Sequence, residues 1–208
     1  MPVVDLLFPA LGGPVPLDHG YLLFSALSVR IPQLHERRDI GVFNLRGDRV
    51  GPDSLGLEGG TLRLRCSTEA LPLLLPLSGS ALELAGRPVR LGVPTVRALP
   101  KPASLSARVV TFKHSLDEQS FHAATLKFMA ELGCTGRPHV GRRRVIRIAG
   151  KKVVGFALDV SELSPESSLK LQEQGLGGRR HMGCGLFLPT RLRSPAGHGM
   201  EARPRSEP

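Results

Sequence analysis

The chain has 208 residues, and its hydrophobic fraction of 41% is enough for one or two packed cores, which excludes a wholly disordered protein. Lys and Arg number 28 against 18 Asp and Glu, and the resulting formal net charge of +10 makes a nucleic acid the first candidate partner. Aromatic residues make up only 4% of the chain, so we expect binding through phosphates more than through base stacking.

The cysteines and the apolar segments predict where the protein works. The three cysteines are far apart and form no CxxC pair, which is typical of reduced thiols in a cytoplasm and argues against a disulfide framework or a zinc knuckle. The N-terminus has no basic stretch, and Asp5 interrupts its first apolar run, so no secretory signal is expected. The longest apolar stretch, residues 70–77, is too short to span a membrane. We therefore expect a cytoplasmic protein with no membrane partner.

In chain order, the first half predicts a strand, a helix, two strands, a short helix and an extended segment. Residues 3–8 form a short apolar run, and residues 21–29 carry apolar side chains at helical spacing until Pro32 ends the pattern. The later elements are expected over residues 40–45, 61–66, 69–77 and 81–99.

The second half predicts the same order of elements. Residues 100–107, with two prolines and two serines, predict a linker. The best helical pattern of the chain covers residues 116–132, and Gly133 ends it. The other elements are a strand, a hairpin of two strands, a helix and a last strand, over residues 108–112, 143–148, 152–158, 166–174 and 184–188.

Each half therefore follows the order β-α-β-β-α-β. This order predicts an α+β fold of two tandem ferredoxin-like domains, residues 1–99 and 108–189. Residues 190–208 are rich in Pro, Arg and Ser, and we expect a disordered tail there.

A glycine-rich segment, residues 175–185, precedes the last predicted strand. Its five glycines permit positive φ angles and close approach of backbone N–H groups to an anion, and two adjacent arginines add donors suited to phosphate. It is no Walker A loop, because neither Lys-Ser/Thr nor a helix follows it. We predict an RNA-binding loop, with a purely structural turn as the alternative. Its candidate contacts are Gly175, Gly177, Arg179, Arg180, His181 and Gly183.

The densest basic stretch falls on the predicted hairpin. Residues 137–152 contain a run of three consecutive arginines and further basic side chains. Basic residues along a hairpin edge would follow the phosphates of an RNA stem, whose deep major groove offers little sequence to read. The alternative is a solvated hairpin. The candidate RNA contacts are Arg142, Arg143, Arg144 and Arg147.

These segments resemble a known family. The spacing G-x-G-x-x-R-x-x-G-x-G over residues 175–185 resembles the C-terminal glycine-rich loop of the CRISPR repeat-processing endoribonucleases, the Cas-six family of the repeat-associated RNA-binding superfamily. Residues 16–27 resemble the family's first helix, and residues 34–43 resemble its catalytic-histidine loop and the following strand. The resemblance covers residues 1–189 and is closest to the myxobacterial-type subtype.

The resemblance implies a reaction and the residues for it. The family cuts RNA without a metal ion or other cofactor, by attack of a ribose 2′-OH on the adjacent phosphate. His35 matches the catalytic histidine, and Tyr21 matches a tyrosine that some members use with it. Arg37 and Arg38 would stabilise the transition state. His19 is the alternative histidine, and the general-acid lysine of some members has no counterpart here, which leaves the second proton carrier open.

Two hypotheses follow. The first is an endoribonuclease that binds repeat stem-loops, cuts precursor CRISPR RNA into guide units, retains its product and works with other CRISPR effector-complex subunits, with no small-molecule substrate. The second is a non-catalytic RNA-binding subunit of the same superfamily. A ribosome-associated ferredoxin-like protein is a weaker third possibility.

Overall fold

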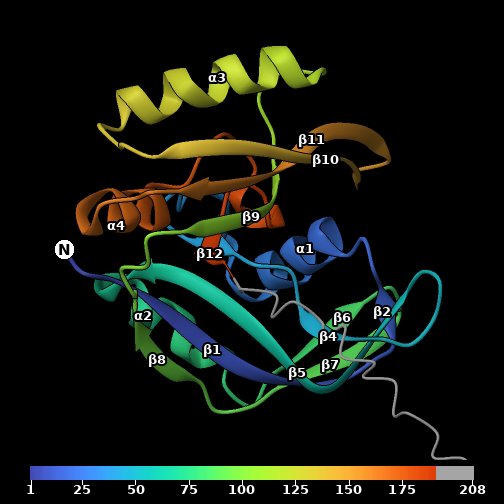
Figure 1. Cartoon of the computed structure of the whole chain (residues 1–208). Helices are drawn as coiled ribbons and strands as arrows, with labels where there is room; N and C mark the ends of the chain where they lie inside the picture. The colour runs from blue at the N-terminus through green and yellow to red at the C-terminus, as the bar shows by residue number, and fades with distance from the viewer. Residues whose placement is uncertain (191–208) are drawn as a thin grey trace, which may run out of the picture.

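A computed structural model describes residues 1–190, and it contains two layered halves (Figure 1). The predicted tail therefore lies outside the described residues, except for Thr190. Both halves contain an antiparallel sheet and helices, and the predicted α+β fold of tandem ferredoxin-like units is confirmed. No helix in the described range 1–190 is long and apolar enough to cross a membrane.

The N-terminal half is built on an eight-stranded sheet. The path β4-β5-β1-β8 within it follows the ferredoxin-like strand order, and the β6–β7 hairpin extends the sheet from the end of β1. Alternate residues of β1 face the core, among them Leu6 and Phe8, which pair with Leu64 and Leu62 of β5. The strands and helices are β1 (Val3–Gly12), β2 (Val15–Pro16), α1 (Gly20–Arg30), η1 (Pro32–His35), β3 (Gly41–Val42), β4 (Arg46–Arg49), β5 (Ser54–Ser67), η2 (Thr68–Ala70), α2 (Leu71–Leu74), η3 (Leu75–Leu77), β6 (Ala81–Leu84), β7 (Arg87–Leu91) and β8 (Thr95–Ala98).

The C-terminal half has a four-stranded sheet in the order β10-β11-β9-β12, which is the ferredoxin-like order. Helix α3 covers one face of this sheet (Figure 1). Asp117 caps α3 by accepting a hydrogen bond from the Ser120 N–H, and Gly133 follows its end with a φ of 60°. The elements are β9 (Leu105–Val110), α3 (Glu118–Glu131), β10 (Arg137–Ile148), β11 (Lys151–Ser161), α4 (Pro165–Gln174), η4 (Arg180–Met182) and β12 (Phe187–Pro189).

Several predicted boundaries differ from the structure: the strand expected over residues 40–45 is β3 followed by β4, and the strand expected over residues 143–148 already begins at Arg137. Two further differences have a clear cause. Strand β9 begins at Leu105, within the predicted linker, because Leu105 and Ala107 alternate into the core between exposed or half-buried neighbours. The last strand begins at Phe187 and not at residue 184, because Gly185 has a φ of 67° and its N–H and C=O groups bond within the glycine-rich segment and to β9. The predicted helix over residues 69–77 is a series of short helical turns that contain two prolines.

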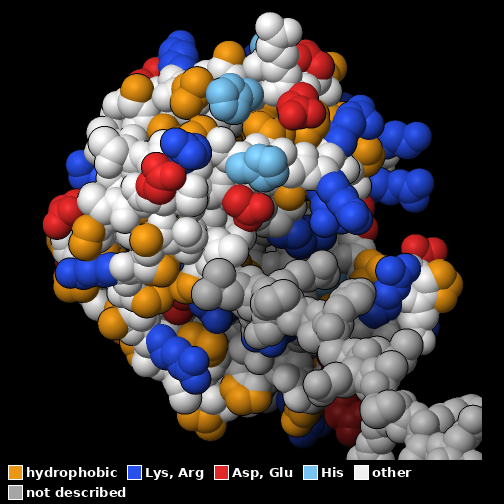
Figure 2. Space-filling view, in the orientation of Figure 1, with side chains coloured by type: hydrophobic (Ala, Val, Ile, Leu, Met, Phe, Trp, Pro, Cys, Tyr) orange, Lys and Arg blue, Asp and Glu red, His pale blue; other side chains and the backbone are white. Residues whose placement is uncertain are grey.

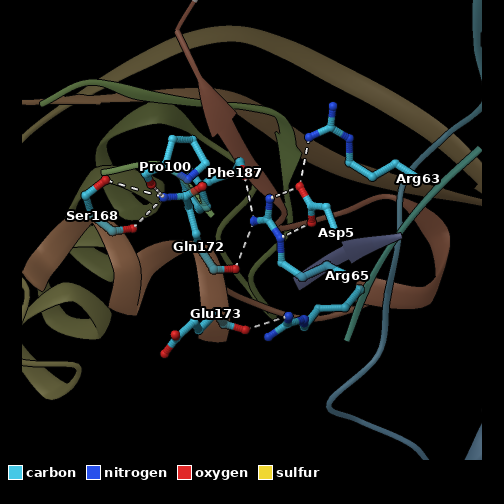
Figure 3. Close-up of polar contacts among 9 residues, drawn as sticks. Asp5, Arg63, Arg65, Pro100, Ser168, Gln172, Glu173 and Phe187 are labelled. Atoms are coloured by element: carbon cyan, nitrogen blue, oxygen red, sulfur yellow. Dashed lines mark hydrogen bonds and ion pairs between the residues drawn. The ribbon is translucent and has the colours of Figure 1, made fainter. Parts of the chain in front are cut away.

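Arg65, one member of a buried ion pair, joins the two halves. Arg65 of β5 and Asp5 of β1 are almost fully buried, and Arg65 Nε and Nη2 donate to the two Asp5 carboxylate oxygens over 2.7 and 3.0 Å. Arg65 Nη1 also donates to the backbone carbonyls of Gln172 in α4 and Phe187 in β12, over 3.0 and 2.8 Å (Figure 3). Arg65 therefore holds both elements that flank the glycine-rich segment against the N-terminal sheet.

Candidate functional site

His35 lies at the end of η1, directly after α1. Pro32 begins this turn, and Leu34 anchors it in the core with 1% of its surface exposed, while His35 is exposed. The His35 ring meets the ring of Phe24 from α1 edge to face, with centroids 4.8 Å apart and an interplanar angle of 71°. The predicted catalytic histidine is thus held against a buried aromatic ring and remains open to solvent.

A second histidine reaches the same aromatic ring from the other half of the chain. The His181 ring stacks on Phe24 with centroids 5.2 Å apart and an interplanar angle of 5°. His181 Nε2 lies 2.8 Å from the backbone carbonyl oxygen of Arg37, and since a carbonyl only accepts, Nε2 is the donor. The sequence predicted His181 as an RNA contact, and the contact that it shares with His35 on the ring of Phe24 was not foreseen.

The other residues predicted beside His35 have different surroundings. Tyr21 is half-buried on α1, one turn before Phe24. Arg37 donates two hydrogen bonds to the Asp39 carboxylate, over 2.8 and 2.7 Å, and this pairing raises the pKa of Arg37 and lowers that of Asp39. Arg38 is exposed and forms no ion pair with any residue of the described range. Of the two predicted arginines, Arg38 is the one whose charge is not already paired.

The rival histidine, His19, is part of the core. It is 1% exposed, its Nδ1 lies 2.7 Å from the Pro16 carbonyl oxygen, and its Nε2 accepts a hydrogen bond from the Leu45 N–H over 2.8 Å. Both ring nitrogens are therefore occupied, with the proton on Nδ1. Burial lowers the pKa of His19, which favours the neutral ring. These contacts suit a histidine that supports the start of α1 and the chain before β4.

The glycines of the glycine-rich segment allow it to pack against neighbouring backbone. A Cβ atom at Gly177 would overlap the Thr111 carbonyl, and one at Gly175 would overlap the Gly185 carbonyl. A Cβ at Gly183 would overlap the side-chain amide of Asn44, in the N-terminal half. All three glycines have φ angles between 67° and 76°. Close backbone packing, which is within the C-terminal half at Gly175 and Gly177 and between the halves at Gly183, is therefore a first reason for glycine at these predicted RNA-contact positions.

The two arginines of the glycine-rich segment differ in what they contact. Arg180 Nη2 donates to the Glu173 carbonyl over 2.8 Å, and its Nη1 donates to the Gln174 carbonyl, so this side chain satisfies the end of α4. Burial lowers the pKa of Arg180 to about 10. Arg179 is exposed, and the one hydrogen bond of its side chain within the described chain is a 3.3 Å contact with the Thr111 hydroxyl. Arg179 is thus better placed than Arg180 to meet a phosphate.

The basic hairpin presents unpaired charge at the edge of the C-terminal sheet. All four predicted arginines are exposed on the edge strand β10, and none forms an ion pair with a described residue. A register shift between Val140 and Arg143 bends the strand and separates the directions of neighbouring side chains. Figure 2 shows Lys and Arg side chains gathered where this hairpin projects. The Arg147 N–H donates to Asp18, which ties the hairpin to the chain before α1.

The structure also reveals residues that sequence reasoning missed. A cleft of about 930 Å³ lies between the two sheets, next to Asn44 and Gly183. Its charged lining comes from both halves and is largely basic: Arg46, Arg63, Arg97 and Arg108, with Asp5. These arginines are scattered along the sequence and no run of charge marks them. Only the folding of two sheets against each other brings them together.

Comparison with known proteins places the chain in a family. The family model described as Cas6 Crispr matches residues 4–192. The protein named CRISPR-associated endonuclease Cas6 from Myxococcus xanthus (strain DK1622) is 58% identical over 203 residues, which is 97% of this chain and 88% of that protein. The family and the myxobacterial type predicted from the sequence are confirmed.

Solved structures agree in fold. A CRISPR associated protein Cas6 has a TM-score of 0.63 at 13% identity, with 91% of this chain and 99% of that chain covered. A RAMP protein binding different RNA substrates has the same TM-score at 10% identity, with 92% and 100% covered. Thermus thermophilus Cse3, solved with an RNA representing a pre-cleavage complex, has a TM-score of 0.55 at 13% identity, with 92% and 100% covered. On the strength of the family match and the Myxococcus relative, this chain belongs to the Cas6 family of CRISPR proteins.

Proposed function

We propose that this protein is an endoribonuclease that binds the repeat stem-loop of precursor CRISPR RNA and cuts it into guide units. The reaction is attack of a ribose 2′-OH on the adjacent phosphate without a metal ion, and the protein retains its product. His35 removes the proton from the 2′-OH, and Tyr21 and Arg38 support it. Because retention leaves the guide on the protein, other CRISPR effector subunits are the expected partners, in the cytoplasm.

The observation that carries this proposal is the setting of His35. Its ring is exposed, yet Phe24 supports it, and Leu34 anchors the turn that carries it. Histidine titrates near neutral pH and is the side chain that most often serves as a general base. His19, by contrast, has both ring nitrogens in hydrogen bonds inside the core. The endonuclease name of the Myxococcus relative, at 58% identity, supports cleavage by this chain as well.

RNA binding is supported by three basic surfaces. The β10 arginines are exposed and unpaired within the described residues, and Arg179 is exposed on the glycine-rich segment. Arg46, Arg97 and Arg108 line the cleft between the sheets without an ion pair in the described chain, whereas Arg63 of the same cleft bonds Asp5. An RNA stem would rest against the hairpin through its phosphates. The three cysteines are buried free thiols, which fits the proposed cytoplasmic location.

The test is cleavage of a repeat RNA in the presence of EDTA. We expect the wild-type protein to cut at one bond, leaving a 2′,3′-cyclic phosphate and a 5′-OH, and a 2′-deoxy nucleotide before that bond to stop the reaction. His35→Ala should slow cleavage by about 10²–10⁴-fold, because a positioned general base contributes about that much. The matched control is His122→Ala, since His122 is an exposed histidine on α3.

Each other outcome has a defined meaning. If His19→Ala abolishes cleavage below its melting temperature while His35→Ala cuts normally, the assignment of His35 is wrong. If the wild-type protein binds the stem-loop and never cuts it, the chain is the non-catalytic RNA-binding subunit. Loss of activity in EDTA that Mg²⁺ restores would overturn the metal-independent mechanism. Product retention predicts one cut per protein molecule under excess substrate, followed by a much slower phase.

A further inference from the structure

We propose that His181 is the general acid of this reaction, protonating the departing 5′ oxygen while His35 takes the proton of the 2′-OH. This inference rests on the proposed function and adds the second proton carrier to it. The two histidines come from different halves of the chain, and both rings contact one residue, Phe24. Their roles follow from the different contacts of the two rings.

The hydrogen bond of His181 fixes which ring nitrogen exchanges a proton. Nε2 donates to the Arg37 carbonyl over 2.8 Å, so it keeps its hydrogen in both the neutral and the charged ring. Nδ1 has no hydrogen-bond partner within residues 1–190, and the side chain is half-exposed. The Arg37 carbonyl thus orients the ring, as the third group of a catalytic triad orients its histidine, and leaves Nδ1 to deliver the proton.

Phe24 distinguishes the two rings. The His181 ring lies almost parallel to it, at 5° and 5.2 Å, so a charged imidazolium would rest on the negatively polarised face of the aromatic ring. The His35 ring is steeply inclined to Phe24, at 71°. The stacked and hydrogen-bonded His181 is therefore suited to donate the proton, and the exposed His35, in the predicted catalytic loop, is left with the role of the base.

Close packing holds His181 in this place. A Cβ atom at Gly20, the first residue of α1, would lie 2.6 Å from the Met182 carbonyl oxygen, so only glycine lets the turn η4 approach the helix this closely. On the other side of η4, Gly183 lies against Asn44. The turn that carries His181 is thus held between α1 and the chain after β3, next to the loop that carries His35.

The step is balanced with these two residues alone. The 2′ oxygen forms a bond to phosphorus as its proton passes to the His35 ring, and the bond from phosphorus to the 5′ oxygen breaks as the Nδ1 proton of His181 passes to that oxygen. The products are a 2′,3′-cyclic phosphate and a 5′-OH, and no electron donor or acceptor is needed. Exchange of one proton with water on each ring restores the starting state.

The experiment compares an ordinary repeat RNA with one whose scissile 5′ oxygen is replaced by sulfur. A thiolate leaves without protonation, so the sulfur substrate needs a base and no acid. We expect His181→Ala to cut the ordinary RNA about 10²–10⁴-fold more slowly than wild type and the sulfur RNA within about threefold of wild type. His35→Ala should be slow on both substrates.

A second variant separates chemistry from packing. His181→Gln keeps an amide donor near the Arg37 carbonyl but has no proton to transfer, and it should show the same recovery on the sulfur RNA. Both variants should weaken binding of an uncleavable 2′-deoxy repeat by no more than a few-fold, because His181 is one RNA contact among many, so a cleavage loss of about 10²-fold or more reports the chemical step.

If both His181 variants are as much slower than wild type on the sulfur RNA as on the ordinary RNA, His181 is not the acid. The same conclusion follows if both variants cut the ordinary RNA as fast as wild type. In either case the proposed function still stands. If wild type cuts neither RNA, the proposed function itself has failed. The two failures are therefore distinguishable in one set of measurements.

Discussion

The contact between the two halves, here called the seam, and the β10–β11 hairpin are both rich in arginine. The seam arginines are bonded within the described chain, and the hairpin arginines Arg142–Arg144 are not. At the seam, Arg65 and Arg180 direct their guanidinium groups at a carboxylate and at backbone carbonyls of the protein itself. On the hairpin, Arg142–Arg144 are exposed and form no ion pair within the described chain. An arginine is available to RNA only if its donors are not already bonded, so the seam arginines should control stability and the hairpin arginines should control affinity.

The largest expected effect is at the seam. Replacing Arg65 by Met leaves the buried Asp5 carboxylate with Arg63 as its single partner, and the backbone carbonyls that Arg65 binds lose this donor. This change should lower the free energy of unfolding by about 3–5 kcal/mol. The measurement is urea unfolding followed by circular dichroism. The matched control is Arg63→Met, since Arg63 also bonds Asp5 but its side chain is 26% exposed, and its loss should cost about 1 kcal/mol. Equal losses for the two variants would refute the special place of Arg65.

The hairpin should show the reverse behaviour. Changing Arg142, Arg143 and Arg144 to Ala should weaken repeat-RNA binding by about 10–100-fold and reduce the slope of log K against log salt by about two to three, because each lost phosphate contact removes about one unit. The unfolding free energy should change by less than about 0.5 kcal/mol, since these side chains are exposed.

A control triple variant removes the same charge elsewhere. Arg90, Lys101 and Lys127 are exposed and lie outside the hairpin, so their replacement by Ala should leave the salt slope nearly unchanged. If both triple variants lose affinity equally, overall charge decides binding and the hairpin has no special role.

Two neighbouring arginines sharpen the comparison within one segment. Arg180→Ala removes two donors from the end of α4 and should cost about 1–3 kcal/mol of stability. Arg179→Ala should leave stability within about 0.5 kcal/mol of wild type and weaken RNA binding a few-fold, because Arg179 is exposed. Thermal melts and RNA titrations of the two variants provide the measurement, and an exchange of the two phenotypes would contradict the assignment.

The smallest effect concerns the buried His19. Burial lowers the pKa of His19 in the folded protein, so on acidification His19 of the unfolded chain takes up a proton before His19 of the folded chain does. The contribution of neutral His19 to the free energy of unfolding is therefore fully present above about pH 6.5 and is lost as the pH falls. His19→Asn should cost about 1–2 kcal/mol at pH 7 through the lost acceptor for the Leu45 N–H. Between pH 7 and pH 5 the variant should lose less stability than wild type in unfolding titrations, because it lacks the group that takes up the proton on unfolding. An identical pH dependence in both proteins would show that His19 does not stay neutral when folded.

The sequence predicted the architecture better than the site. The apolar spacing of α1 and α3 and the glycine turn of the hairpin depend on neighbours a few residues away, so both ferredoxin-like units could be identified without a structure. The contact of Phe24 with His35 and His181 joins segments more than 140 residues apart. It depends on how the two halves pack, and no local pattern encodes that.

The same limit applies to the charged residues. Arg63 and Arg65 lie two positions apart on one strand, and both bond Asp5, yet only Arg65 is fully buried and extends to the other half. Alternation along β5 does not separate them, because the difference comes from what α4 and β12 place over the strand. The sequence identifies the arginines, but only the fold shows which of them are bonded within the protein and which are free to contact RNA.

The clamp formed by Arg65 also bears on the order of events during synthesis on the ribosome. His35, Phe24 and Arg65 emerge early, whereas the carbonyls of Gln172 and Phe187 that Arg65 binds emerge more than 100 residues later. Until those residues leave the exit tunnel, the nascent chain carries His35 but does not yet hold His181 against Phe24. We therefore expect incomplete chains to be inert toward RNA, so that no fragment released early could cut transcripts in the cell.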